Sequence, residues 1–253
     1  MYKRYNKLLL LLIIGFLPFF IIGGCDDDNG GGGGACPETN VSIAVCDPDA
    51  GPFSLVIDNG FFPAVVGSQS VLEDEEGVVR LEITALDEIE AVAGIQTRVL
   101  EEREFEDDLL IEVSRNFFAQ AEDGTVCYFG EEVDICDDGL EPVGDKFLCN
   151  GEEPSHEGAW RAGEDDNLPG IIMLAEPEVG LVYNEEVAPG IAEDIAEVTD
   201  LGEPIEVLDE IFFDTLTTLD CSPLDPGARD TKVYIRDMGI ARDEDLFLVE
   251  FVP

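Results

Sequence analysis

The sequence predicts a mainly β fold with little helix, in which one antiparallel sheet forms a sandwich or an incompletely closed barrel. Apolar Val79, Leu81 and Ile83 alternate with the polar residues between them. Val233 and Ile235 alternate in the same way with Lys232, Tyr234 and Arg236, and the same period of two recurs at residues 109–114 and 247–251. Such alternation is typical of antiparallel strands with one face in the core and the other in solvent.

Turn-forming residues separate these segments at short intervals. They lie at residues 58–60, 122–124, 137–139, 169–170, 189–190 and 226–227. Short strands at this spacing favour a sandwich or a barrel. Residues 192–198 carry good helix formers and are the one segment where a helix is expected. The tetrapeptide LDEI occurs at 86–89 and again at 208–211, which is too short to establish a repeat.

The first residues of the chain have the pattern of an export signal. The basic residues Lys3, Arg4 and Lys7 precede an apolar run over residues 8–22, and two glycines follow. A basic start, a short apolar core and small residues at a cleavage point are typical of secretory signals. At about 15 residues the run is shorter than the roughly 20 that a transmembrane helix needs. We expect residues 1–24 to be a signal peptide, with a plain secretory signal as the alternative to a lipoprotein signal.

Cys25 directly follows the two glycines, and this arrangement resembles the bacterial lipobox. The resemblance implies cleavage before Cys25 and a diacylglycerol on its thiol. Lipid chains bind a bilayer with about 0.8 kcal/mol per buried methylene, so several chains hold a protein firmly. The lipidated cysteine and a glycine-rich tether then make up residues 25–35. We expect an exported protein, lipid-anchored to a bacterial membrane and facing the periplasm or the cell exterior.

The charge of the chain restricts its partners. Asp and Glu number 58 against 13 Lys and Arg, which gives a formal net charge of −45. Such a protein repels nucleic acid, which requires basic residues, and it repels anionic headgroups, so the lipid must hold it at the membrane. The acidity is typical of adaptation to salt, which screens self-repulsion. Cation binding is the functional alternative, and a protein or small-molecule partner stays unknown.

Six cysteines remain once Cys25 is assigned to lipid, and an even set in an exported protein indicates disulfides. Proximity in sequence favours the pairs Cys36–Cys46 and Cys136–Cys149, which leaves Cys127–Cys221, although fifteen pairings are possible. A zinc site is disfavoured because no pair has the two-residue spacing of a zinc knuckle. We expect residues 36–52 to be a disulfide-pinned loop and residues 53–253 to be a single antiparallel β domain.

Several short motifs, each different in sequence, are spread along the body of the chain. They are NGFFP at 59–63, DGTVCYFGE at 123–131, EGAWRAG at 157–163, PGIIM at 169–173, APGIAED at 188–194, PLDPG at 223–227 and GIARDE at 239–244. Together they resemble a group of bacterial exported proteins and lipoproteins of unknown function. The resemblance implies an antiparallel β body akin to the open half-barrels of lipoprotein carriers, and no catalytic activity. Cys127 replaces an aromatic residue of the group, and residues 136–149 resemble an insertion.

Catalytic motifs are absent from the sequence. His156 is the only histidine, and neither a Gly-x-Ser-x-Gly elbow nor a His-Glu-x-x-His motif or Walker loop accompanies it. We therefore predict no enzyme and no catalytic residue. Paired carboxylates of a glycosidase carry no signal in so acidic a chain.

Calcium is the one cofactor that the sequence suggests, because oxygen ligands in loops suit this cation. The candidate ligands are Asp134, Asp137, Asp138, Glu164, Asp165 and Asp166. Neither loop fits the twelve-residue EF-hand pattern, and solvated acidic loops are the simpler interpretation.

Three functions remain open. The first is a membrane-anchored acidic lipoprotein that acts as a binding or structural module. The second is a carrier that holds an apolar ligand on a concave sheet, for which Tyr128, Phe129, Trp160 and Tyr183 could line the pocket, although ordinary core packing is the simpler role for these aromatics. The third is a secreted hydrolase. A continuous apolar cavity would favour the second over the first.

Overall fold

The computed structural model describes residues 35–253. The expected signal peptide, Cys25 and nearly all of the tether lie outside the described residues. Two short 3-10 helices and twenty strands make up the secondary structure. Their bounds are η1 Ile43–Cys46, η2 Pro48–Ala50, β1 Phe53–Ser54, β2 Ile57–Asp58, β3 Pro63–Ala64, β4 Gln69–Glu73, β5 Val79–Val92, β6 Ile95–Glu106, β7 Leu109–Ala121, β8 Val126–Ile135, β9 Leu140–Val143, β10 Lys146–Cys149, β11 Trp160–Arg161, β12 Gly170–Met173, β13 Val182–Asn184, β14 Ile195–Leu201, β15 Ile205–Val207, β16 Glu210–Phe212, β17 Thr215–Ser222, β18 Asp225–Ile235, β19 Gly239–Asp243 and β20 Leu246–Val252.

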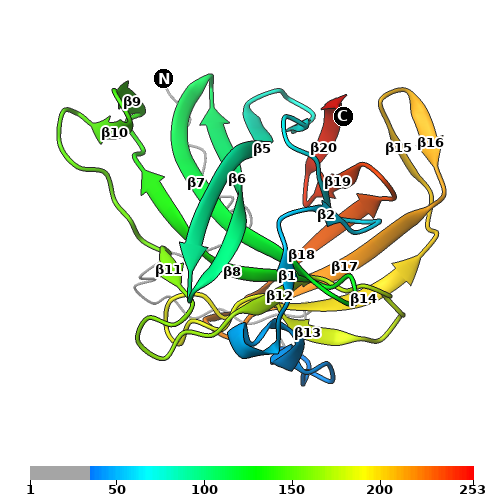
Figure 1. The fold of residues 1–253 in the computed structure, drawn as a ribbon. Helices are drawn as coiled ribbons and strands as arrows, with labels where there is room; N and C mark the ends of the chain where they lie inside the picture. The colour runs from blue at the N-terminus through cyan, green and yellow to red at the C-terminus, as the bar shows by residue number, and fades with distance from the viewer. Residues whose placement is uncertain (1–34) are drawn as a thin grey trace, which may run out of the picture.

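One antiparallel sheet of 14 strands forms the body of the protein, as the alternation predicted. Its order is β11-β8-β7-β6-β5-β4-β20-β19-β18-β17-β14-β13, with β1 beside β7 and β12 beside β8. Strands β4 to β8 form one wall of an open barrel, and strands β14 and β17 to β20 form the other (Figure 1). The two walls join where β4 pairs with β20, the last strand of the chain, in the middle of the sheet.

The two ends of the sheet approach each other without closing into a continuous barrel. The Leu168 amide donates a hydrogen bond to the Val187 carbonyl (2.9 Å) across this gap. Gly170 begins β12 here, and a Cβ on it would lie only 2.0 Å from the Glu185 carbonyl oxygen. Glycine at position 170 is therefore what lets the two backbones come together. The prediction of an incompletely closed barrel or sandwich is confirmed.

Cross-strand pairing decides which side chains point into the barrel. Lys232 lies between Thr218 and Asp243 in one cross-strand row, and Glu102 lies opposite Ile83 in the other wall. Residues opposite each other in a sheet share a face, so each row points to one side. Glu102 and Lys232 line the same cavity, so both rows face the interior.

The prediction for β18 was right about Val233 and Ile235 and wrong about Lys232. Alternation placed Val233 and Ile235 in the core and Lys232 in solvent. Both sides of this strand are buried, because Val233 and Ile235 pack in one apolar cluster with Ile205 and Val207 of the β15–β16 hairpin. The opposite side of β18, which carries Lys232, lines the barrel interior.

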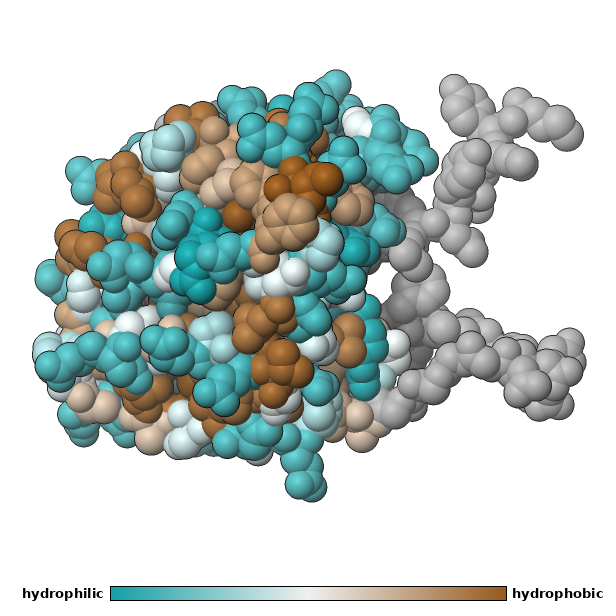
Figure 2. All heavy atoms as spheres, turned by 90° about the vertical axis from the view of Figure 1, so that its right-hand side faces the viewer, coloured by the Kyte–Doolittle hydropathy of each residue, from teal (hydrophilic) through white to brown (hydrophobic). Residues whose placement is uncertain are grey.

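On the face of the molecule that Figure 2 shows, hydrophilic residues surround separate hydrophobic patches.

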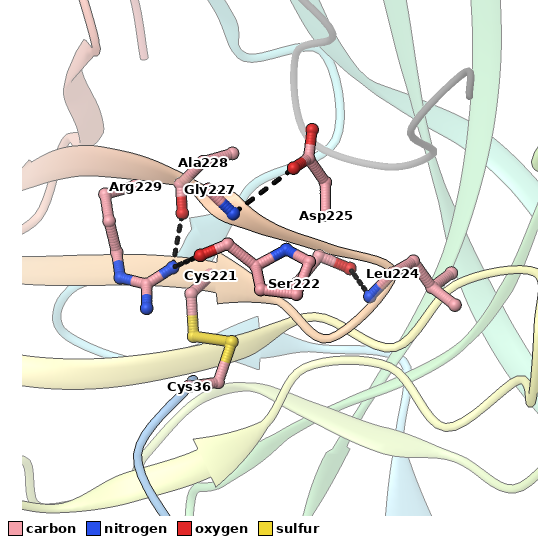
Figure 3. The surroundings of a disulfide bond; sticks show 9 residues. Cys36, Cys221, Ser222, Leu224, Asp225, Gly227, Ala228 and Arg229 are labelled. Carbon is pink, nitrogen blue, oxygen red and sulfur yellow. Dashed lines mark hydrogen bonds between the residues drawn. A yellow bond between two sulfur atoms is a disulfide. The ribbon is translucent and has the colours of Figure 1, made fainter. Parts of the chain in front are cut away.

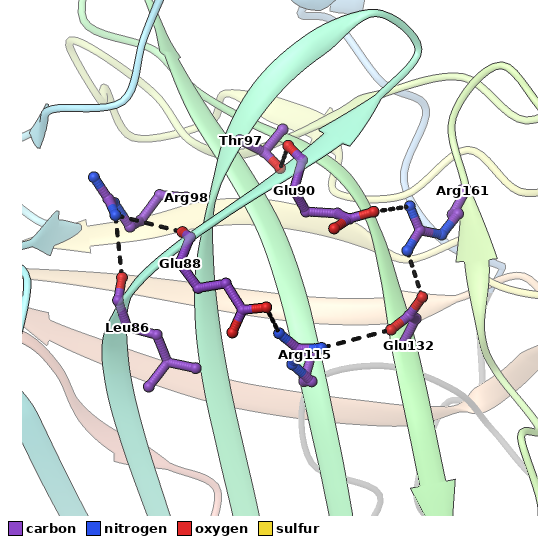
Figure 4. Close-up of polar contacts among 8 residues, drawn as sticks. All are labelled: Leu86, Glu88, Glu90, Thr97, Arg98, Arg115, Glu132 and Arg161. Carbon is purple, nitrogen blue, oxygen red and sulfur yellow. Dashed lines mark hydrogen bonds and ion pairs between the residues drawn. The ribbon is translucent and has the colours of Figure 1, made fainter. Parts of the chain in front are cut away.

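Ion pairs on the outer face tie β5, β7, β8 and β11 together (Figure 4). Arg115 contacts Glu88 (2.5 Å) and Glu132 (3.8 Å), and Arg161 contacts Glu90 (3.0 Å) and Glu132. Arg161 also lies over the ring of Phe117, 4.7 Å from its centroid. Exposed pairs of this kind contribute about 0–1 kcal/mol each, so the network aligns strands more than it stabilises them.

All six remaining cysteines form disulfides, but two of the three pairs expected from proximity are wrong. Cys136–Cys149 is confirmed, whereas Cys36 pairs with Cys221 (Figure 3) and Cys46 pairs with Cys127. The segment before β1 is therefore bound to the barrel rather than closed on itself. These two links span 185 and 81 residues of sequence, and loops of that length restrict the unfolded chain by about 4–5 kcal/mol in a chain-entropy account.

Two local predictions also fail, and the LDEI match has no structural meaning. Residues 192–198, expected to be helical, lead into β14, whose β-branched residues pair with β17. Of the expected turns, 169–170 enters β12 and 226–227 lies inside β18, because the chain reverses just before that strand. The two LDEI tetrapeptides are unrelated in structure, since one lies within β5 and the other spans the β15–β16 turn.

Candidate functional site

A cavity of about 60 Å³ lies between the two walls of the barrel. At roughly 10–15 Å³ per water position, it has room for about four to six waters or a small organic molecule. Most of its lining is apolar: Phe62, Pro63, Ala64, Ile83, Ala85, Leu100, Phe118, Ile172, Met238, Ile240 and Phe251. Its polar lining consists of Ser68, Ser70, Glu102, Lys232 and Tyr234. A largely apolar pocket with a few polar groups is typical of small-molecule sites.

Lys232 is held on the cavity wall by Asp220 of the neighbouring strand β17 and by Glu185, which follows β13. Its Nζ lies 2.7 Å from Asp220 Oδ2 and 4.0 Å from Glu185 Oε2, and the residue is only 6% exposed. Burial alone would lower the pKa of Lys232, but Asp220 and Glu185 outweigh it and raise that pKa well above its usual range. Lys232 is therefore charged, and its charge is already paired.

Glu102 is the one carboxyl among the lining residues, and it has no partner. It is 7% exposed and makes no hydrogen bond or ion pair with the residues that the structure describes. Burial, and then the charge of Asp243, raises its pKa from the usual 4.5 to about 8. The carboxyl therefore carries a proton at neutral pH and faces the cavity as a free donor and acceptor.

Further carboxyls surround these two residues inside the barrel. Burial is the main cause that raises the pKa values of Asp243 and Glu104 to about 7 and that of Glu112 to about 8. Burial, followed by the charge of Glu186, also holds the pKa of Glu131 well above its usual range. Lys232 is the cation that stabilises the ionised forms of Glu102, Glu185, Glu186, Asp194 and Asp243. We call Lys232 and the five carboxyls that it stabilises the buried ion cluster.

This arrangement suits binding better than hydrolysis. Hydrolysis by two carboxyls requires both to flank the substrate, whereas Glu102 alone of the described carboxyls lines the cavity. His156 lies elsewhere: its half-exposed ring contacts the Val133 carbonyl (2.7 Å) and Asp134 (3.1 Å).

The two acidic loops predicted to bind calcium do not assemble a site in the described chain. Within residues 35–253, no group of three or more His, Cys, Asp or Glu side chains is arranged to hold a metal ion. Asp134 contacts His156, and Asp138 accepts a hydrogen bond from Asn150 (3.1 Å). Asp165 has a left-handed backbone conformation, with φ of 48°, in a turn after β11. Calcium binding stays a prediction.

The four aromatic residues proposed for a pocket are buried but do not line the cavity. Tyr128 stacks on Phe118, a lining residue, at 4.7 Å between ring centroids and meets Trp160 edge-on at 5.3 Å. Phe129 packs against Phe53 at 5.5 Å. Tyr128, Phe129 and Trp160 therefore pack against other rings, which is the core-packing role.

Sequence reasoning missed both Glu102 and Lys232. Glu102 stands in the run EEREFE, which has the composition of a solvated face, and alternation placed Lys232 in solvent. One usable signal was the scarcity of lysine: beyond residue 24 the chain has only Lys146 and Lys232. In so acidic a chain, a lysine at the centre of an alternating strand is a candidate partner for buried carboxylates.

The disulfides bear on where the protein is found. Three disulfides indicate an oxidising compartment outside the cytoplasm. In the described part of the chain, no helix is both long enough and apolar enough to span a bilayer.

Models of known protein families, curated proteins and solved structures were all compared with this chain, and none matched it.

Proposed function

We propose that this protein is an exported, lipid-anchored binding protein that holds a small, mostly apolar ligand inside its open barrel. The observation that carries this proposal is the cavity between the two walls, which has an apolar lining and a single unpartnered carboxyl. Ligand sites in barrels are of this kind, with apolar walls and a few polar groups that set orientation. Of the functions that the sequence left open, the cavity favours the carrier.

The lipid anchor on Cys25 would hold this binding protein at the membrane surface, and the glycine-rich tether would keep its body away from anionic headgroups. The acidic composition supports this arrangement, since electrostatic attraction cannot retain the protein there. An oxidising compartment, supported by the disulfides, agrees with an exported location.

Titration with hexan-1-ol tests the proposal, because this molecule matches the size of the cavity and carries no charge. We expect saturable changes in the amide NMR shifts of lining residues, among them Leu100, Phe118 and Tyr234. Ala85→Leu adds bulk to the cavity wall and should weaken binding at least tenfold. Ala91→Leu is the matched control, because Ala91 lies in the same strand and is exposed, so its affinity should equal that of the original protein.

Circular dichroism must show that both variants keep the β fold. NMR shifts that do not saturate in the original protein, or equal hexan-1-ol affinities in the two variants, would show that this cavity is not a ligand site.

A further inference from the structure

We propose that the ligand of this cavity carries a positively charged amino group, which forms an ion pair with the carboxylate of Glu102. This inference rests on the proposed binding function and extends it to the chemical class of the ligand. It begins from the lining of the cavity, where Glu102 points inward from β6 with no partner of its own. A buried carboxyl without a partner is costly, so a site that contains one calls for a ligand group that satisfies it.

Lys232 is not available for an anionic ligand. Its ammonium group is already engaged by Asp220 at 2.7 Å, with Glu185 at 4.0 Å. An incoming anion would have to displace a buried carboxylate from the only lysine of the cluster. An incoming cation requires no such exchange, because Glu102 is free.

The titratable groups that face Glu102 are acidic, except for Lys232. Asp243 on β19 and Glu104 on β6 repel its ionised form, whereas Lys232 on β18 stabilises it. Glu112 on β7 and Glu131 on β8 also interact with it. Acidic groups outnumber the lysine around this carboxyl, so the potential inside the barrel becomes negative as these groups lose their protons above about pH 7. In a partly desolvated interior such a potential attracts a cation more strongly than it would in water.

Hydroxyl groups in the same lining supply the other contacts that an ammonium group needs. A primary ammonium donates three hydrogen bonds. Ser68, Ser70 and Tyr234 line the cavity with Glu102. Ser70 belongs to the same cross-strand row, because Ile83 lies opposite both Ser70 and Glu102. One carboxylate with hydroxyls beside an apolar wall matches an amphiphilic amine.

Binding of an amine at Glu102 releases a proton. In the empty cavity the Glu102 carboxyl, with its pKa near 8, is protonated at pH 7. When the ammonium form of the ligand binds, this proton passes to solvent and the carboxylate pairs with the ammonium. Affinity for an amine should therefore rise with pH up to about 8 and fall again as the free amine loses its own proton near pH 10. Affinity for a carboxylate ligand should fall over the same range.

Titrations with hexylamine, hexan-1-ol and hexanoate between pH 6 and 9 test this inference, in 0.5 M sodium chloride to screen the acidic surface. We expect hexylamine to bind about tenfold more tightly at pH 7 than at pH 6 and to exceed hexan-1-ol at pH 8. Glu102→Gln should keep hexan-1-ol binding but lose at least tenfold in hexylamine affinity, together with its pH dependence. Glu101→Gln, on the outer face of the same strand, is the control and should behave as the original protein.

Hexan-1-ol binding without preference for hexylamine, or tightest binding of hexanoate, would overturn the amine inference and leave the binding function standing. Equal hexylamine affinity in Glu102→Gln and the original protein would overturn it as well. Failure of all three compounds to bind would overturn the binding function itself.

Discussion

Raising the pH from 5 to 8 is expected to lower the free energy of unfolding by about 4 kcal/mol or more. The buried ion cluster is the cause. Glu102 titrates near pH 8 and Asp243 near pH 7 in the folded protein, against usual values of 4.5 and 3.8. Between these limits the folded state keeps protons that the unfolded chain has released. The stabilisation from these two groups is therefore greatest below about pH 4 and is lost as the pH rises through 7 and 8.

Urea denaturation followed by fluorescence of Trp160, the only tryptophan, measures this effect at constant salt. Each such carboxyl contributes up to about 1.4 kcal/mol per pH unit within its range. Glu102→Gln removes one of them and should make the dependence on pH shallower, whereas Glu101→Gln should leave it unchanged. A stability that is constant or rises between pH 5 and 8 would show that the interior carboxyls are ionised and compensated.

Replacing Lys232 by methionine is expected to destabilise the protein by about 3–5 kcal/mol at pH 7. Methionine keeps the volume of the side chain but leaves Asp220 and Glu185 buried without their cation. Lys146→Met is the matched control, because Lys146 is exposed in β10 and its loss should change stability by less than about 0.5 kcal/mol. Thermal unfolding of both variants, with the disulfides intact, distinguishes the loss of the buried, paired lysine from the loss of the exposed one.

The cost of Lys232→Met should shrink at pH 5, where Asp243, whose pKa burial raises to about 7, is protonated and needs no cation. A variant as stable as the original protein at pH 7 would show that the carboxyls around position 232 do not depend on the lysine.

The positions of the strands could be predicted from the sequence, but the face of each strand that points into the barrel could not. A period of two follows from the pleat of any half-buried strand, so 79–83, 109–114, 232–236 and 247–251 were correctly predicted. Which face becomes the interior depends on strands distant in sequence. Val233 is covered by the β15–β16 hairpin, and this left Lys232 to face the barrel interior.

The same limit applies to the disulfides and to the site. Cys46–Cys127 and Cys36–Cys221 depend on how the N-terminal segment crosses the folded sheet, which no local pattern records. The motif stretches were better guides than composition, because Glu131, Trp160 and Asp243 all lie in such stretches and all are buried. Glu102 lies outside them, in an acidic run whose burial only the register with β5 and β7 reveals.

The proposed ligand site depends on Glu102 being an uncharged, unpartnered carboxyl inside the cavity at neutral pH. The most direct test is a pH titration of its side-chain carboxyl carbon by NMR in ¹³C-glutamate-labelled protein, with Glu102→Gln to assign the signal. We expect Glu102 to titrate near pH 8 in the free protein and at lower pH once hexylamine is bound. A carboxyl that titrates near 4.5 and does not respond to hexylamine would contradict the claim.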